Sequence, residues 1–200
     1  MSIQENHKGA VLNDPSLWLL VFSNLVTAFF AIQQGWSLAG IMFIYWFQSI
    51  IIGFFNFVRI LRLKEFDTSQ VSINGRSATQ KDKKFIAYFF LVHYGLFHFG
   101  YFFLVLGQDP SILKEKFVYL TAALFFINHL FSYLYNAPRD TKKQNIGNLM
   151  FYPYVRILPM HLTAFLGSTL TVFLTLKTFA DALMHIIEHR VIRKGEETIS

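Results

Sequence analysis

The sequence has 200 residues, of which 54% are hydrophobic, 18% aromatic and only 15% charged. Soluble domains carry about 25% charged residues, so a chain this poor in charge cannot cover a water-soluble globule and must expose much of its surface to lipid. The absence of cysteine excludes disulfides, thiolate nucleophiles and cysteine-ligated iron–sulfur clusters. The formal net charge of +6 indicates basic cytoplasmic loops rather than a nucleic-acid partner, because the basic residues lie mostly between apolar runs.

Two apolar helices are predicted after a polar tail formed by residues 1–14. Asp14-Pro15 is a helix start, with Asp as N-cap and Pro in the first helical position. The first helix is expected over residues 15–32, and no small-residue cleavage site follows it, so we interpret it as a retained span. After a turn at Gln33-Gln34-Gly35, a second helix is expected over residues 36–60.

The middle of the chain predicts two more spans. Residues 63–84 are polar and too short to fold alone, so we interpret them as a cytoplasmic connector. A third helix is expected over residues 85–106. Asp109-Pro110 repeats the start signal, and the apolar run 117–135 follows as a fourth helix that ends at Asn136-Ala137-Pro138.

The last apolar stretch, residues 149–192, allows two interpretations. It is either one long helix broken at Pro159, or two helices joined by a tight turn at Gly167-Ser168. Two helices return the basic residues before the polar tail 193–200 to the side of the other basic loops, as the positive-inside rule requires.

The predicted fold is therefore all-α: a single polytopic transmembrane helix bundle with six spans, five being the alternative. It is expected in the cytoplasmic membrane, with the lipid bilayer as its surroundings and both termini in the cytoplasm. A homo-oligomer stays open.

The richest source of candidate site residues is a polar stripe in the last span. Lys177, Asp181, His185 and His189 recur every four residues, so they share one face of an otherwise apolar helix. Ionisable side chains inside a span cost about 2.5 to 3.5 kcal/mol each, so they tend to face the bundle interior in pairs. If the chain turns at Gly167, Arg156 lies at the depth of Lys177 and Asp181, which predicts an ion-pair or ligand site formed by these three residues.

Two further groups of polar residues are candidates. A divalent metal ion is one hypothesis, because Asp and His at helical spacing can share an ion; its ligands would come from His161, Asp181, His185 and His189. Near the middle of their own spans lie Gln48, His93 and His129. These could converge with the stripe, and His93 with His129 could hold a haem.

The motifs leave several functions open. No Gly-x-Ser-x-Gly elbow, Walker motif or dinucleotide-binding glycine pattern is present. We therefore weigh a membrane protein that binds or transports an ion or small polar ligand first, and a membrane-embedded metal-dependent hydrolase second. Bis-histidine haem binding is a third hypothesis, and a structural or partner-binding subunit is a fourth.

One pattern carries a resemblance: Lys177-Thr178, Asp181, His185 and Glu188-His189, in the order Lys-Thr-x-x-Asp-x-x-x-His-x-x-Glu-His. With Arg156-Ile157 and Tyr45-Trp46-Phe47-Gln48 further upstream, the chain resembles an uncharacterised prokaryotic family of small polytopic integral membrane proteins. The resemblance implies a multi-span fold and brings no established activity.

Overall fold

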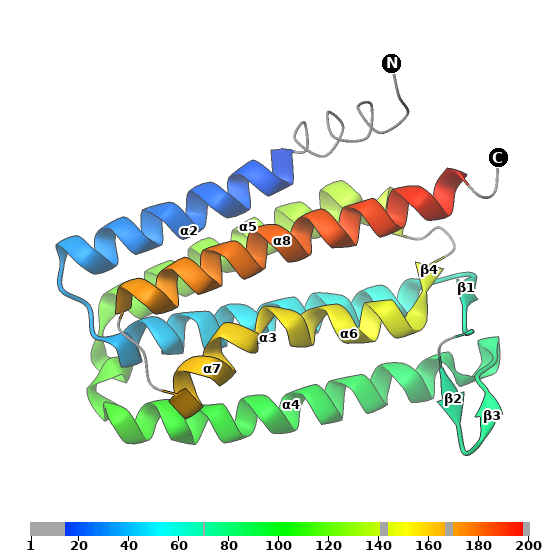
Figure 1. The fold of residues 1–200 in the computed structure, drawn as a ribbon, viewed down its shortest axis with the longest axis horizontal. Coiled ribbons are helices and arrows are strands. Elements are labelled where there is room, and N and C mark those ends of the chain that lie inside the picture. Colours follow the sequence, from blue (N-terminus) through cyan, green and yellow to red (C-terminus); the bar gives the residue numbers. More distant parts are fainter. Residues whose placement is uncertain (1–14, 70, 141–143, 167–169, 198–200) are drawn as a thin grey trace.

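A computed structural model describes residues 15–69, 71–140, 144–166 and 170–197 (Figure 1). Side chains are described for these residues except 16, 137–140, 164–166, 170–171 and 188–197. The α-helices are α2 (Pro15–Gln33), α3 (Leu38–Arg62), α4 (Lys83–Gln108), α5 (Lys116–Asp140), α6 (Ile146–Arg156), α7 (Leu158–Leu166) and α8 (Leu170–Glu197). Short 3-10 helices, η1 (Gln80–Asp82) and η2 (Pro110–Lys114), precede α4 and α5. The predicted all-α fold is confirmed.

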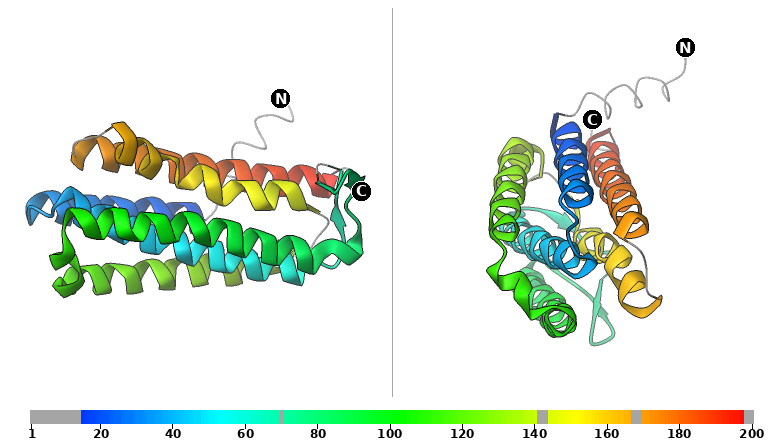
Figure 2. Two further views of the ribbon diagram at one scale, coloured as in Figure 1. Left: turned by 90° about the horizontal axis from the view of Figure 1, so that it is seen from below. Right: turned by 90° about the vertical axis from the view of Figure 1, so that its left-hand side faces the viewer.

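Helix α3 is the central element of the bundle. It packs against α4, α5 and α6, while α2 packs against α5 and α8, and α8 also contacts α6 and α7. Viewed along the bundle, α3 is surrounded by the other helices (Figure 2). It is accordingly the most buried of the three long apolar helices. Side chains on α3 can therefore meet residues from most of the chain.

The outer surface is apolar, as a lipid environment requires. On α4 the exposed large side chains include Phe85, Phe89, Leu96, Phe99 and Phe103. Among the described residues three stretches are long and apolar enough to cross a membrane: Leu38–Arg62, Gln80–Gln108 and Lys116–Asn136. The apolar part of α2 is shorter than these. A membrane protein is thus supported, while the number of spans stays a prediction.

The expected connector carries short strands at one end of the bundle. β1 (Phe66–Asp67) pairs in parallel with β4 (Gln144–Asn145), and β2 (Ser72–Ile73) pairs with β3 (Arg76–Ser77) as a hairpin. The hairpin turn is Asn74-Gly75, both at positive φ (51° and 79°), the conformation that this dipeptide favours in two-residue hairpins. The hairpin turn of the connector therefore follows from the local sequence.

The C-terminal stretch is both broken and folded back. α6 ends at Arg156 and α7 begins at Leu158; the break fits Pro159, which has no N–H to bond the carbonyl of Val155. α8 then packs along both α6 and α7 (Figure 1). The predicted tight turn at Gly167-Ser168 lies outside the described residues.

Helix α5 differs from its predicted end. The sequence favoured a stop at Asn136-Ala137-Pro138, but α5 continues to Asp140. A proline in the last turn removes one hydrogen bond, from its own nitrogen to the carbonyl of Leu134, and the frayed end of a helix can adjust to the ring more easily than its interior can. The prediction of a stop at Pro138 was therefore wrong.

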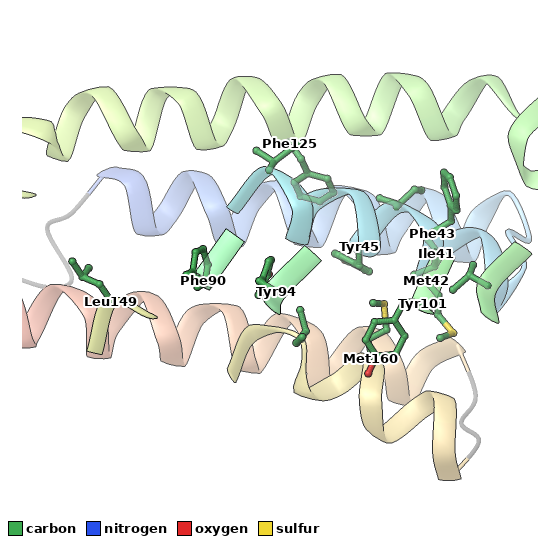
Figure 3. Close-up of a cluster of buried hydrophobic side chains, with 14 of the residues drawn as sticks. Ile41, Met42, Phe43, Tyr45, Phe90, Tyr94, Tyr101, Phe125, Leu149 and Met160 are labelled. Atoms are coloured by element: carbon green, nitrogen blue, oxygen red, sulfur yellow. The ribbon is translucent and has the colours of Figure 1, made fainter. Parts of the chain in front are cut away.

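A core of large apolar side chains fills the space around α3 (Figure 3). Ile41, Met42 and Tyr45 of α3 are each at most 1% exposed. α3 and α4 approach closely at Gly53, where the ring of Tyr94 occupies the space of a missing side chain. The Tyr94 hydroxyl lies 2.6 Å from the Ser49 hydroxyl, so this contact has both a packing and a polar component.

Candidate functional site

The centre of the candidate site is an ion pair buried within the bundle. Lys177 and Asp181 lie one turn apart on α8, and the Lys177 ammonium donates to Asp181 Oδ1 at 2.6 Å. The two residues are 4% and 0% exposed. Charges so deeply buried are stable only with partners, so each residue of this pair depends on the other.

Neighbouring helices hold both ends of the pair. The Asn24 amide on α2 donates to the second oxygen of Asp181 at 2.9 Å. The Lys177 ammonium lies 4.8 Å from the centre of the Tyr45 ring on α3, within the range of a cation–π interaction. Both Asp181 oxygens are thus bonded, and the Lys177 charge rests against an aromatic face.

Arg156, on α6, adds a second positive charge. It is 6% exposed, and its charge acts on both Lys177 and Asp181. Arg156 also has interactions of its own within the protein. The structure therefore brings together the three residues for which the sequence suggested an ion-pair or ligand site.

A second polar group, from α3 and α5, adjoins the first. The side-chain nitrogen of Gln48 lies 3.3 Å from His129 Nε2, and Asn128 donates to the Ser23 hydroxyl at 3.2 Å. His129 lies within electrostatic reach of Arg156, Asp181, Lys177 and His185. Of the mid-span candidates, Gln48 and His129 thus meet each other beside the charged stripe.

A small cavity of about 60 Å³ opens next to these residues. Its apolar lining comes from Leu20, Ile52, Phe55 and Pro153. Its polar lining consists of Asn56, Arg59, Asn128, His129, Ser132, Tyr152, Arg156 and His185. A polar cavity of this size has room for a few water molecules or a small ligand.

Some candidates lie away from the centre. His161 on α7 packs edge-on against the Tyr101 ring, with centroids 5.0 Å apart, and its Nδ1 lies 3.0 Å from the Ile157 carbonyl oxygen. His93 is exposed on α4, with its Nδ1 2.7 Å from the Tyr154 hydroxyl. Because His93 and His129 have different partners on different helices, the arrangement gives no support to a shared haem.

The metal hypothesis gains no ligand group from the structure. Within the described part of the chain, no three His, Asp or Glu side chains lie where they could hold one ion. His185 is buried and faces the cavity, and the side chain of His189 lies outside the described residues. His161, Asp181 and His185 therefore do not form a metal site together.

The comparisons with known proteins assign a family. The model of a family of unknown function, DUF6498, matches residues 8–198, nearly the whole chain. The chain belongs to this family. The expectation of an uncharacterised family is thereby confirmed. No curated protein and no solved structure matches the chain.

In this DUF6498 member the site also contains residues that were not predicted as site candidates. Asn24 and Tyr45 contact the ion pair, and Arg59 and Tyr152 line the cavity. Asn24 could have been predicted, because it is an amide within the apolar run of the first helix and buried amides in a membrane need partners. Tyr45 and Tyr152 carried no such signal, because aromatic residues occur on every face of these helices.

Three buried polar atoms at the site have no hydrogen-bond partner among the described residues: Asn24 Oδ1, Tyr45 Oη and Gln48 Oε1. Their residues are each at most 1% exposed. An unpaired buried polar atom costs about 1 to 3 kcal/mol. The site therefore has hydrogen-bonding capacity that its own side chains leave unused.

Proposed function

We propose that this protein is a multi-pass membrane protein that binds a small polar or ionic ligand inside its helix bundle, as a transporter or a membrane receptor for that ligand does. The ligand would occupy the polar cavity beside Lys177 and Asp181. The bundle would cross the cytoplasmic membrane six times, with the end that carries the strands in the cytoplasm. This orientation follows the positive-inside rule, because the basic connector lies at that end.

The observation that carries the proposal is a polar cavity in the interior of an apolar bundle, with its lining residue His185 one helical turn from the buried charged pair. Helix packing alone does not call for a cavity, because empty space costs stability. It also does not call for unpaired buried acceptors such as Gln48 Oε1 and Asn24 Oδ1. A ligand or water in the cavity would relieve the first cost. A donor that reaches Gln48, the neighbour of the lining residue His129, would also relieve the second.

The rival explanation is a structural or partner-binding subunit whose ion pair only fixes helix packing. The hydrogen bond from Asn24 to Asp181 supports it, because this bond joins α2 to α8. The two explanations differ in one respect: only a binding protein gains stability from a soluble ligand.

A ligand screen separates the two explanations. The detergent-purified protein would be unfolded by heat in the presence of inorganic ions, amino acids, carboxylates, phosphates and nucleosides. We expect at least one compound to raise the Tm of the wild type. The increase should be reduced or lost in Gln48→Met, which removes the buried amide that contacts His129 of the cavity lining. It should be kept in Gln108→Met, which removes an exposed amide at the end of α4.

If no compound raises the wild-type Tm, the binding proposal fails and the structural explanation replaces it. If a compound raises the Tm of the wild type and of Gln48→Met equally, the ligand binds elsewhere and the proposed site is wrong.

A further inference from the structure

We infer that the cavity binds a small oxyanion, a carboxylate or phosphate group, which enters from the end of the bundle that carries the strands. This inference rests on the proposed function and specifies the ligand. It comes from the kinds of side chain that line the cavity, from the state of Asp181 and from the charge at the cavity's end of the bundle.

The lining is built to donate hydrogen bonds and carries positive charge. Arg59 of α3 and Arg156 of α6 contribute guanidinium groups, and His129 and His185 contribute imidazoles. Hydroxyl and amide donors complete the lining: Asn56, Asn128, Ser132 and Tyr152. No carboxylate is among the described side chains of the lining. Guanidinium groups match the planar oxygens of carboxylates and the oxygens of phosphates better than any other side chain does.

Among the described side chains, Asp181 is one turn from the lining residue His185 but does not itself line the cavity. Asp181 uses one oxygen for Lys177 and the other for Asn24. Its charge is therefore already compensated beside the cavity. Arg59, Arg156, Tyr152 and His185 have further interactions in the protein, which would hold their side chains in place for a ligand.

The cavity volume limits the ligand to a small group. About 60 Å³ accommodates a few waters, and an oxyanion that displaces them presents acceptor oxygens to the same donors. A bulky nucleotide or sugar would not fit within this space, although an oxyanion at the end of a larger molecule would.

The position of the cavity supports entry from the end of the bundle that carries the strands. Arg59 lies in the last turn of α3, which leads into the connector at the strand end of the bundle (Figure 1). The same connector exposes Lys81 and Lys84. A basic surface raises the local concentration of anions and speeds their entry.

The test measures binding of radiolabelled inorganic phosphate and of radiolabelled acetate by equilibrium dialysis on the full chain in detergent. We expect saturable binding of one of them. Arg59→Gln and Arg156→Gln should each weaken it by about tenfold or more, because each removes a charged donor. Arg76→Gln is the matched control: it removes an arginine from the exposed hairpin and should leave the affinity unchanged.

A lipid headgroup also presents a phosphate, so a short-chain phosphatidic acid is tested beside inorganic phosphate. Competition between the two, with the same loss in Arg59→Gln, would support the oxyanion site and identify a lipid phosphate as a second source. Arg59→Lys keeps the positive charge. It provides a second test of the site if Arg156→Gln does not fold. It should retain part of the affinity that Arg59→Gln loses.

The inference is overturned if the wild type binds neither phosphate, acetate nor phosphatidic acid, or if Arg59→Gln and Arg156→Gln bind as well as Arg76→Gln. This failure is distinct from failure of the proposed function. A cation or neutral compound that raises the wild-type Tm through Gln48 would keep the binding protein and replace only the oxyanion.

Discussion

Asn24 on α2 donates a hydrogen bond of 2.9 Å to Asp181 on α8, across 157 positions of the chain. The bond joins the first and the last of the described helices at the level of the buried ion pair. Because Asp181 is fully buried, each of its hydrogen bonds is worth more than one at the surface. The Asn24 amide should therefore stabilise the packing of α2 on α8.

Asn24→Leu tests this dependence. The substitution removes one donor from a buried carboxylate, so we expect the free energy of unfolding to fall by about 1 to 3 kcal/mol. Denaturant unfolding of the protein in detergent, followed by circular dichroism, measures the change.

Thr27→Val is the matched control for Asn24→Leu. Thr27 is also buried on α2, but its hydroxyl bonds the Ser23 carbonyl of its own helix at 2.8 Å. Its replacement should cost much less than Asn24→Leu. Equal losses of stability in the two variants would show that the hydrogen bond from Asn24 to Asp181 adds nothing to the effect of removing a polar group from α2.

The ion pair itself should show strong energetic coupling. Lys177→Met leaves the buried Asp181 carboxylate without its ammonium partner, and Asp181→Leu leaves the Lys177 ammonium without its carboxylate. We expect each single substitution to cost about 3 to 5 kcal/mol and the double substitution to cost less than either. Unfolding of the four proteins as a double-mutant cycle measures the coupling.

The exposed pair of Arg76 and Asp82 provides the comparison for that cycle. Its two bonds are each 2.8 Å, but the Arg76 side chain is 56% exposed. Arg76→Gln and Asp82→Asn should show weaker coupling, which salt weakens further. If the two pairs show the same coupling and the same salt dependence, Lys177 and Asp181 are not shielded from water as the structure implies.

Much of the fold could be predicted because a helix that crosses a lipid bilayer needs a long apolar run, which is easily recognised in a sequence. Apolar runs of span length marked α3, α4 and α5, and Ser37, the N-cap of α3, accepts a hydrogen bond from the Gly40 amide as capping chemistry requires. The β-hairpin of the connector was not predicted, because the polar composition around Asn74-Gly75 conceals two very short strands. The end of α5 was misplaced because a proline in a last turn costs only one hydrogen bond.

The candidate site could be predicted only along one helix. Four-residue spacing put Lys177, Asp181 and His185 on one face, and burial of all three agrees with it. The same reasoning could not show that His161 faces Tyr101 or that His93 contacts Tyr154. Helix rotation about its own axis decides such partners, and it depends on packing between distant segments.

Gly53→Ala tests the close approach of α3 and α4. A Cβ on Gly53 would overlap the Tyr94 ring, with Cδ1 only 2.7 Å away. The ring must shift, which also disturbs its hydrogen bond to Ser49. We expect a loss of about 1 to 3 kcal/mol from overpacking, measured by unfolding in detergent.

Gly95→Ala and Gly100→Ala are the controls for Gly53→Ala. Both glycines lie on α4 with nothing within 4 Å of an added Cβ, so both variants should keep wild-type stability or gain slightly from helix propensity. A loss as large as that of Gly53→Ala in either variant would mean that another surface covers α4 at that glycine.

The orientation of the bundle can be tested because the chain has no cysteine, so each introduced cysteine is the sole thiol. Gln34→Cys and Lys114→Cys lie at one end of the bundle, and Ser77→Cys and Lys81→Cys at the other; all four positions are exposed. With the basic connector in the cytoplasm, a membrane-impermeant maleimide should label the first two in intact cells. It should label the other two only after permeabilisation. Ala31→Cys, at a fully buried position, should resist labelling throughout.

The same experiment distinguishes six spans from five through Ser200→Cys. Six spans place this residue on the side of Ser77, so it should be labelled only after permeabilisation. Labelling of Ser200→Cys in intact cells, with Ser77→Cys still protected, would instead require an odd number of crossings. α6, α7 and α8 would then have to count as one crossing in total, although α8 packs along both other helices. Labelling of Gln34→Cys and Ser77→Cys from the same side would contradict a membrane-spanning α3, since these positions flank it.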